Sequence, residues 1–244
     1  MFDRRINIFT GHFGSGKTEV AVNFAIKLSE LSRKKFEHSA GIDEKTAIVD
    51  MDIINPFFRT VDAKSELEKH GIWVISSIYA NTNVDIPALP SEIYTLFEKK
   101  EYKVVFDVGG DDLGAKAVSR FRQEILSDDY ELFFVVNVKR PMTDTPEKIK
   151  EMIYIIEESS GIKITKLVNN TNYLFDTTAE DIIEGHKMLE EVSKETGVPI
   201  AFASGLRKPL EEAGQVIKVP LLPIGKLIKL PWEQDGDEGL EIEI

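Results

Sequence analysis

The feature that most constrains the fold of this chain is an eight-residue glycine-rich string between a predicted strand and a predicted helix. Residues 11–18 read G-H-F-G-S-G-K-T and match the pattern G-x-x-x-x-G-K-[ST] at every fixed position. An apolar run at residues 5–10 precedes the string, and an amphipathic helical pattern at residues 17–34 follows it. This order predicts a strand–loop–helix unit whose loop wraps around a phosphate group.

Each fixed position of the loop has a physical reason. Glycines at 11, 14 and 16 allow backbone angles that turn successive N–H groups inward toward an anion. Lys17 would reach the β- and γ-phosphates, and the Thr18 hydroxyl would bind magnesium. We therefore predict binding of ATP or ADP together with Mg²⁺. The predicted nucleotide contacts at the loop are Gly11, His12, Phe13, Gly14, Ser15, Gly16, Lys17, Thr18 and Glu19.

Strand-like and helix-like segments alternate along the rest of the chain. This alternation predicts an α/β fold with three layers (α/β/α) and a mostly parallel sheet of seven or eight strands, as in phosphate-loop NTPases. Residues 1–232 are expected to form a single nucleotide-binding domain, and residues 233–244 an acidic, flexible tail. The further strands are expected at 46–51, 72–76, 103–108, 131–138, 162–168 and 198–203, and the further helices at 90–99, 115–126, 145–159 and 179–196.

The amino-acid composition restricts the kinds of partner and binding site that this chain can have. The net charge of −12, with 42 acidic and 30 basic residues, argues against a nucleic-acid-binding protein, because such proteins need many Lys and Arg contacts to phosphates. The absence of cysteine excludes disulfides and thiolate metal sites. No apolar run approaches the roughly 20 residues that span a bilayer, so no membrane association and a cytoplasmic location are expected.

Three carboxylates fall at the predicted carboxyl ends of strands, which is where open α/β sheets place their ligands. Asp50 and Asp52 end the second predicted strand, and their i, i+2 spacing puts both side chains on one face. Asp107 ends the strand at 103–108 and is followed by V-G-G. The predicted metal-binding residues are therefore Thr18, Asp50 and Asp107.

With these motifs, the chain resembles the MinD/ParA-like branch of the SIMIBI class of phosphate-loop ATPases over residues 5–206. Residues 49–56 (V-D-M-D-I-I-N-P) look like the family's switch I, 106–111 (F-D-V-G-G-D) like switch II, and 166–170 (K-L-V-N-N) like its base-reading strand. The resemblance implies that Lys17 and Asp52 are catalytic, with Asp52 positioning the attacking water. It also implies that Asp107 supports the metal through water and that Asn169, in preference to Asn170, reads the adenine edge.

Two differences from the family pattern matter. Residues 169–172 (N-N-T-N) lack the Asp of the guanine-reading Asn-Lys-x-Asp pattern, which favours ATP over GTP. His12 stands where most MinD/ParA-like members carry a second lysine that reaches across a dimer. The sequence therefore leaves open whether the chain forms a homodimer, because the usual argument for a nucleotide-bridged dimer is missing.

Three functions follow as alternatives. The first is an ATPase that acts as a nucleotide-controlled switch or chaperone for an unknown protein partner, through residues 52–60 and 109–114. The second is a small-molecule kinase or ATP-dependent ligase resembling dethiobiotin synthetase, in which residues 79–85 line a substrate site and Arg59, Lys139 and Arg140 clamp an anionic substrate. The third is a nucleotide sensor that binds ATP or ADP without hydrolysis.

Overall fold

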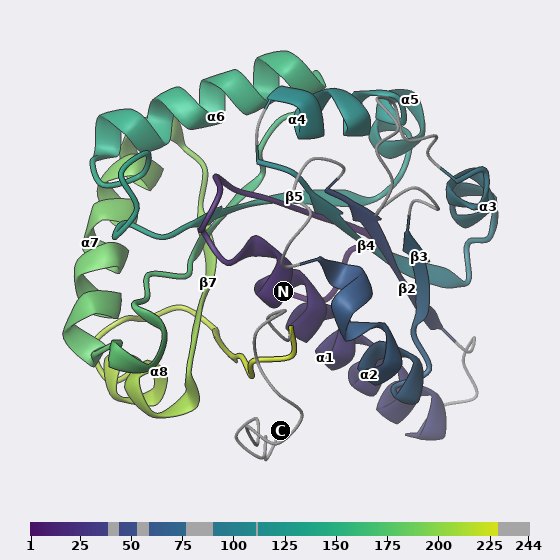
Figure 1. Cartoon of the computed structure of the whole chain (residues 1–244), viewed down its shortest axis with the longest axis horizontal. Helices are drawn as coiled ribbons and strands as arrows, with labels where there is room; N and C mark the ends of the chain where they lie inside the picture. The colour runs from purple at the N-terminus through teal and green to yellow at the C-terminus, as the bar shows by residue number, and fades with distance from the viewer. Residues whose placement is uncertain (39–43, 53–58, 77–89, 111, 229–244) are drawn as a thin grey trace.

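An eight-stranded β-sheet forms the centre of the molecule in a computed structural model that describes residues 1–38, 44–52, 59–76, 90–110 and 112–228 (Figure 1). Neighbouring strands pair in parallel in the order β3-β2-β4-β1-β5-β6-β7-β8. The α/β prediction is confirmed, with eight strands. These are β1 (Ile6–Thr10), β2 (Lys45–Met51), β3 (Trp73–Ser76), β4 (Tyr102–Val108), β5 (Tyr130–Val136), β6 (Lys166–Asn169), β7 (Ile200–Gly205) and β8 (Leu221–Pro223).

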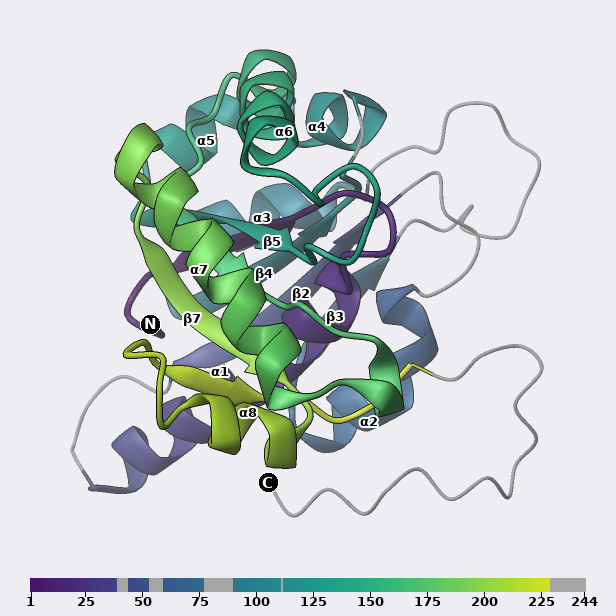
Figure 2. The same ribbon diagram turned by 90° about the vertical axis from the view of Figure 1, so that its left-hand side faces the viewer.

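Helices cover both faces of this sheet, which gives the predicted three layers. One face carries α1 and α2, and the other carries α3 to α6, as Figures 1 and 2 show from two directions. Helix α8 packs with α7 near the β7–β8 edge. The described helices are α1 (Lys17–His38), α2 (Lys64–Lys69), α3 (Glu92–Glu98), α4 (Asp112–Ser119), α5 (Arg122–Leu126), α6 (Pro146–Ser160), α7 (Ala179–Thr196) and α8 (Arg207–Ala213).

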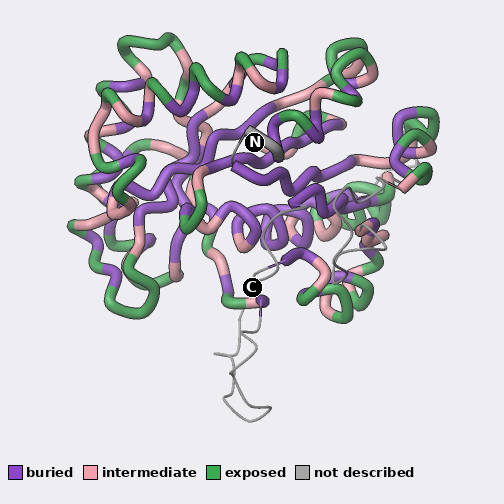
Figure 3. The backbone as a smooth tube through the Cα atoms, turned by 45° about the horizontal axis from the view of Figure 1, so that its top comes forward, coloured by how far each residue is buried: buried purple, intermediate pink, exposed green. Residues whose placement is uncertain are grey.

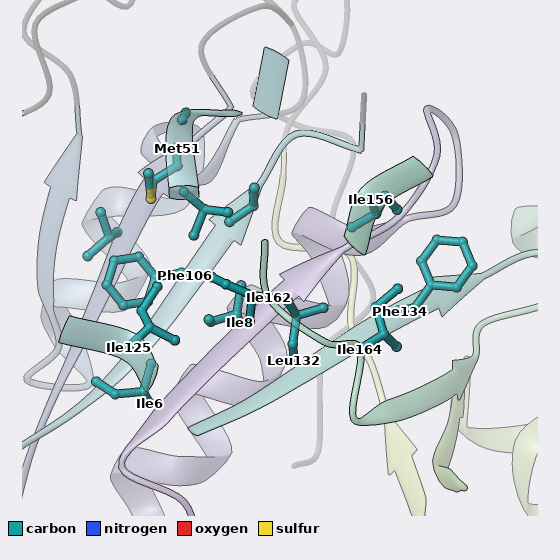
Figure 4. Close-up of a cluster of buried hydrophobic side chains, with 14 of the residues drawn as sticks. Ile6, Ile8, Met51, Phe106, Ile125, Leu132, Phe134, Ile156, Ile162 and Ile164 are labelled. Carbon is teal, nitrogen blue, oxygen red and sulfur yellow. The ribbon is translucent and has the colours of Figure 1, made fainter. Parts of the chain in front are cut away.

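The central strands are apolar on both sides because each side packs against helices. Ile8 belongs to the core cluster beneath α3 to α6, whereas its neighbour Phe9 belongs to the cluster beneath α1. Figure 4 shows the first cluster, where Phe106, Leu132 and other side chains of adjacent strands gather. The sheet is buried and the outer helix surfaces are exposed (Figure 3). Burying each such large apolar side chain stabilises the fold by about 1.5–3 kcal/mol.

Several elements differ from the sequence prediction. The helix predicted at 115–126 is two helices, α4 and α5, separated at Phe121, whose backbone N–H bonds to Val118. Strand β6 starts at Lys166 instead of residue 162. Helices α2 and α8 and strand β8 have only three to seven residues each, and periodicity gives little signal over such short segments. The predicted tail at 233–244 lies outside the described residues.

The order of the strands brings the predicted site residues together. Strand β1, which leads into the glycine-rich loop, lies between β4 and β5. In the register of the sheet, Phe9 is opposite Asp107, and Asp107 is opposite Asp50. Because all these strands are parallel, the loop and both aspartates lie at the same edge of the sheet.

Candidate functional site

The glycine-rich loop has the backbone shape that the motif requires. Gly14 and Gly16 have φ angles of 79° and 78°, a region that favours glycine over other residues. The loop closes through a hydrogen bond of 2.9 Å from the Ser15 N–H to the His12 carbonyl. The N–H of Val20 donates to the Gly16 carbonyl at 3.1 Å, so the first turn of α1 begins directly at the end of the loop. The loop therefore ends at the positive pole of a 22-residue helix.

Residues from two more distant strands hold this loop in place. The amide Nδ2 of Asn170, just after β6, donates to the Ser15 carbonyl at 2.7 Å. The Ser204 hydroxyl of β7 donates to Oδ1 of the same Asn170 at 3.0 Å. Asn170 is 1% exposed, so both ends of its amide are used for support. This support cannot be recognised in the sequence, because an asparagine after a strand is equally compatible with a turn.

Lys17 and Asp52 form an ion pair inside the site. Lys17 Nζ lies 2.8 Å from Asp52 Oδ2, and both side chains are buried. Burial by itself would lower the pKa of Lys17, but the carboxylates of Asp107 and Asp52 outweigh burial and raise it. The lysine is therefore charged. The two residues that we predicted as catalytic are in direct contact.

The other two predicted carboxylates are bound by the segment that follows β2. Arg59 Nε lies 3.3 Å from Asp50 Oδ2, and the Thr60 hydroxyl donates to Asp107 Oδ2 at 2.9 Å. Burial raises the pKa of Asp50 to about 7 although Arg59 opposes the change. Burial also raises the pKa of Asp107, against the effect of Lys17. The three carboxylates thus share a buried site with two cations, Lys17 and Arg59.

This donor set fits magnesium held together with a nucleotide. Thr18 lies against the Asp107 carboxylate and acts to lower its pKa. Oxygen Oδ1 of Asp107 is buried and has no hydrogen bond within the part of the chain that the structure describes. The described residues of the chain contain no group of three or more His, Asp or Glu arranged around one metal position. Mg²⁺ commonly takes only one or two protein ligands and completes its shell with phosphate oxygens and water. Thr18 and Asp107 would hold it here.

Asn169, the predicted base reader, does not reach the surface of the site. Its side chain is fully buried, and Nδ2 donates to the Ile182 carbonyl of α7 at 2.9 Å. Its oxygen accepts the N–H of Thr171 at 3.1 Å. Both ends of the amide are therefore hydrogen-bonded within the protein, and the role of Asn169 as base reader stays a prediction.

The remaining predicted contacts are distributed around the loop. His12 is half-buried, with Nδ1 3.1 Å from the Phe13 carbonyl oxygen, and the Phe13 side chain is 67% exposed. Glu19 accepts the backbone N–H of Leu227, and burial raises its pKa to about 7. Glu19 thus binds the segment after β8 instead of facing the loop. Its neighbour Asn23 exchanges two hydrogen bonds of 2.9 Å with Gly225 in the same segment.

Two predicted segments lie wholly or partly outside the described residues, and two hollows on the molecule lie away from the glycine-rich loop. Residues 53–58 of the predicted switching segment 52–60 and the whole segment at 79–85 lie outside the described residues. One hollow of about 420 Å³ is lined by α7, β7 and residues 218–219. Another, of about 320 Å³, is lined by the N-terminus, Glu131, Lys166 and β7. Neither hollow is lined by residues of the glycine-rich loop. None of the described helices is long and apolar enough to cross a bilayer.

Comparison with known proteins identifies the class of fold. The chain is similar to the cell division protein FtsY of Thermotoga maritima, with a TM-score of 0.55 and 17% identity, covering 84% of this chain and 63% of that one. The signal recognition particle receptor FtsY of Elizabethkingia anophelis gives a TM-score of 0.49 at 14% identity, over 93% and 62%. This chain spans less than two thirds of either protein. No family model and no curated protein matches it.

The fold is that of a phosphate-loop NTPase. Strand β4, which carries Asp107, lies directly beside the loop strand β1, and the similarity to the first FtsY structure supports this α/β arrangement. The similarity does not test the resemblance to the MinD/ParA-like branch. At 17% identity the match concerns the fold and leaves the nucleotide and the reaction to be argued from the site itself.

The raised pKa of Asp50 predicts a pH dependence of stability. The pKa is about 7 in the folded protein and near 3.8 in the unfolded chain, so the folded state keeps a proton that the unfolded chain has lost. This stabilising contribution is fully present below about pH 3.8 and is lost as the pH rises to about 7. We expect the free energy of unfolding without nucleotide to decline over this window by up to a few kcal/mol from Asp50.

Urea unfolding of the wild type and of Asp50→Asn at pH 5, 6, 7 and 8 measures this decline. Glu19 has a similarly raised pKa and contributes in the same direction, so Asp50→Asn should reduce the decline without removing it. The variant also loses the ion pair with Arg59, and for this reason the comparison uses the slope with pH and not the stability itself. Equal slopes in the two proteins would contradict the assignment.

The contacts of Asn169 predict a structural effect of its removal. Asn169→Ala leaves the Ile182 carbonyl and the Thr171 N–H buried without partners, and we expect a loss of about 1–3 kcal/mol in unfolding free energy. Affinities for ATP and for tripolyphosphate should change by the same factor, because the side chain does not face a base. Chemical denaturation and calorimetry measure both quantities. A loss confined to ATP would instead restore Asn169 as the base reader.

Proposed function

We propose that this chain is a Mg²⁺-dependent ATP-binding protein that hydrolyses ATP and serves as a nucleotide-controlled switch or chaperone for a protein partner. The observation that carries the proposal is the loop at residues 11–18, with two left-handed glycines at the start of α1. Lys17 and Thr18 at the end of this loop adjoin the buried carboxylates of Asp52 and Asp107. This is the chemistry that a polyphosphate with a magnesium ion requires.

Hydrolysis in this site needs mainly positioning and neutralisation of charge. Water attacks the γ-phosphorus, the bond from that phosphorus to the β,γ-bridging oxygen breaks, and ADP and inorganic phosphate leave with the water's proton released. The loop N–H groups and Lys17 hold the phosphate oxygens, and Asp52 orients the water. Magnesium held by Thr18 and Asp107 would supply positive charge to the phosphates. Lys17 is shared between Asp52 and the phosphates, so nucleotide binding and the position of Asp52 are linked.

ATP is the proposed nucleotide. The residues after β6 lack the Asn-Lys-x-Asp pattern whether it is read from Asn169 or from Asn170, because Asn172 and Tyr173 occupy the positions of its Asp. The carboxylate that would accept from a guanine amino group is therefore absent from that pattern. The fold comparison is silent on the base, so GTP belongs in the same binding experiment as ATP.

The switch role rests on contacts at the end of residues 52–60, the segment expected to respond to the nucleotide. Arg59 and Thr60 contact Asp50 and Asp107 directly, so the chain beyond residue 58 is bonded to the carboxylates that a magnesium nucleotide would engage. Occupancy of the site would change the charge that these two residues face. By contrast, Arg59 and Lys139, two of the three cations of the kinase or ligase alternative, are paired with carboxylates, and the third, Arg140, lies against the glycine-rich loop.

Calorimetry with ATP, ADP and GTP, each with Mg²⁺ and with EDTA, tests the proposal. We expect micromolar or tighter ATP binding that weakens at least about tenfold without Mg²⁺, and slow release of phosphate that Asp52→Ala abolishes. Absence of ATP binding would overturn the proposal as a whole. Binding without turnover would support the sensor function, and ADP release that depends on a small molecule would support the kinase or ligase function. Sedimentation with and without ATP decides whether a homodimer forms.

A further inference from the structure

Arg140 differs from the other cations predicted near the site. Arg59 and Lys139 are ion-paired with carboxylates, as described above. Arg140 instead lies against the glycine-rich loop, where its Nε donates to the Gly14 carbonyl at 3.0 Å. A β-carbon added to Gly14 would lie 3.3 Å from that nitrogen and 3.7 Å from the guanidinium carbon. The guanidinium group is therefore in contact with the loop that would hold phosphate.

The backbone that carries Arg140 is fixed by a tight turn after β5. The N–H of Arg140 donates to the Asn137 carbonyl at 3.1 Å, and the N–H of Thr143 donates to the Arg140 carbonyl at 2.9 Å. The hydroxyl of Thr143, which is fully buried, donates to the same Asn137 carbonyl at 2.7 Å. These hydrogen bonds, two of which end at the Asn137 carbonyl, thus fix the backbone from which the Arg140 side chain approaches Gly14. The guanidinium is pre-positioned before any ligand arrives.

The N–H groups on the terminal nitrogens of Arg140 are available to donate to a ligand. Only Nε has an acceptor within the described residues, and no carboxylate there is ion-paired with this guanidinium. The side chain is half-exposed, so these nitrogens remain accessible. The other cation at the loop, Lys17, is held by Asp52. A guanidinium with uncommitted N–H groups matches the geometry of phosphate oxygens.

We propose that Arg140 is a phosphate-binding residue whose terminal nitrogens donate to phosphate oxygens of a nucleoside polyphosphate seated in the loop. The inference rests on the proposed function, since it needs a polyphosphate at residues 11–18. It adds to Lys17 a second cation at the loop, contributed by the turn after β5. The competing interpretation is that Arg140 only supports the loop, as Arg122 supports Gly161 elsewhere in the molecule.

Arg122 provides a matched control. Its Nε donates to the carbonyl of Gly161 at 2.8 Å, and Gly161, like Gly14, has a left-handed backbone with φ of 66°. That contact joins α5 to the end of α6 and involves none of the proposed site residues. Arg122→Gln and Arg140→Gln therefore remove the same charge from the same type of contact. Glutamine keeps an N–H donor for the glycine carbonyl in each case.

The test measures ATP and tripolyphosphate binding to the wild type, Arg140→Gln and Arg122→Gln by calorimetry at 50 and 200 mM salt, with Mg²⁺. We expect Arg140→Gln to weaken both ligands about tenfold, with a smaller salt dependence than the wild type, because one charge-assisted contact is lost. Arg122→Gln should bind both ligands as the wild type does. Melting temperatures without ligand should agree among the three proteins within a few degrees.

Each other outcome overturns the inference in a distinct way. If Arg140→Gln loses affinity for ATP but not for tripolyphosphate, the guanidinium contacts the nucleoside and not the phosphates. If it binds both ligands normally, or melts much earlier than Arg122→Gln, Arg140 acts as a support of the loop. Arg140→Lys, which keeps the charge, should recover part of the affinity in the phosphate-binding case. A wild type that binds neither ligand would instead refute the proposed function.

Discussion

Replacing Lys17 with alanine is expected to lower the affinity for ATP at least about 100-fold, equivalent to about 2.7 kcal/mol. Lys17 is the cation of the loop itself, and its ammonium would make charge-assisted bonds to two phosphates. Calorimetry at saturating Mg²⁺ measures the loss. ATP affinity that survives the substitution unchanged would show that residues 11–18 do not hold the triphosphate.

The ion pair with Asp52 makes a stability control necessary. Lys17→Ala removes the ammonium that is paired with the buried Asp52 carboxylate, and removal of one partner of a buried pair costs about 3–5 kcal/mol. The double variant Lys17→Ala/Asp52→Ala removes both charges and should recover much of the unfolding free energy. We expect it to remain unable to bind ATP. Recovery of ATP binding along with stability would mean that the single variant failed because it was unfolded.

Gly110→Ala is expected to have the second-largest effect, although residue 110 is not part of the loop motif. A β-carbon at this position would lie 1.7 Å from the Gly11 carbonyl oxygen and 2.8 Å from the His12 nitrogen. Both are backbone atoms, so no side chain can rotate away, and the loop itself has to move. We expect a loss of about 3 kcal/mol in unfolding free energy and at least about a tenfold loss of ATP affinity.

Gly205→Ala is the matched control for this prediction. Gly205 ends β7 at the same edge of the sheet, but its added β-carbon would be 3.6 Å from the nearest atom, which is ordinary contact. We expect a change below about 0.5 kcal/mol in stability and unchanged ATP affinity. Urea unfolding and calorimetry on both variants decide the matter. Equal behaviour of the two variants would show that the close approach of Gly110 to the loop does not constrain the protein.

The layered fold could be predicted from sequence because its signals are local and repeated. Buried parallel strands appear as short apolar runs such as residues 103–108, and long surface helices show the 3.6-residue period over many turns, as in α7. Caps reinforce the helix limits: Thr178 starts α7 with a capping box, and Gly197 ends it in the left-handed region. Short elements such as α2 and β8 have too few residues for any period to be visible.

The candidate site could be predicted only in part. Lys17, Asp52 and Asp107 lie at predictable positions, because the loop motif and the strand ends place them at one edge of the sheet. Which partner each one contacts depends on atoms from remote segments. Thr60 bonds Asp107 and Asn170 bonds Ser15, over separations of 47 and 155 residues, and no local pattern encodes such pairs.

The sequence by itself determined that this chain would build a parallel α/β sheet with a phosphate loop at the start of its first helix. Those features follow from backbone preferences and periodicities within one segment at a time. Only the tertiary structure decided that the buried Asn169 amide bonds to α7, that Lys17 is held by Asp52 and that Arg140 reaches Gly14. The physical reason is that hydrogen bonds and ion pairs depend on distances of about 3 Å between side chains that only the packed sheet brings together.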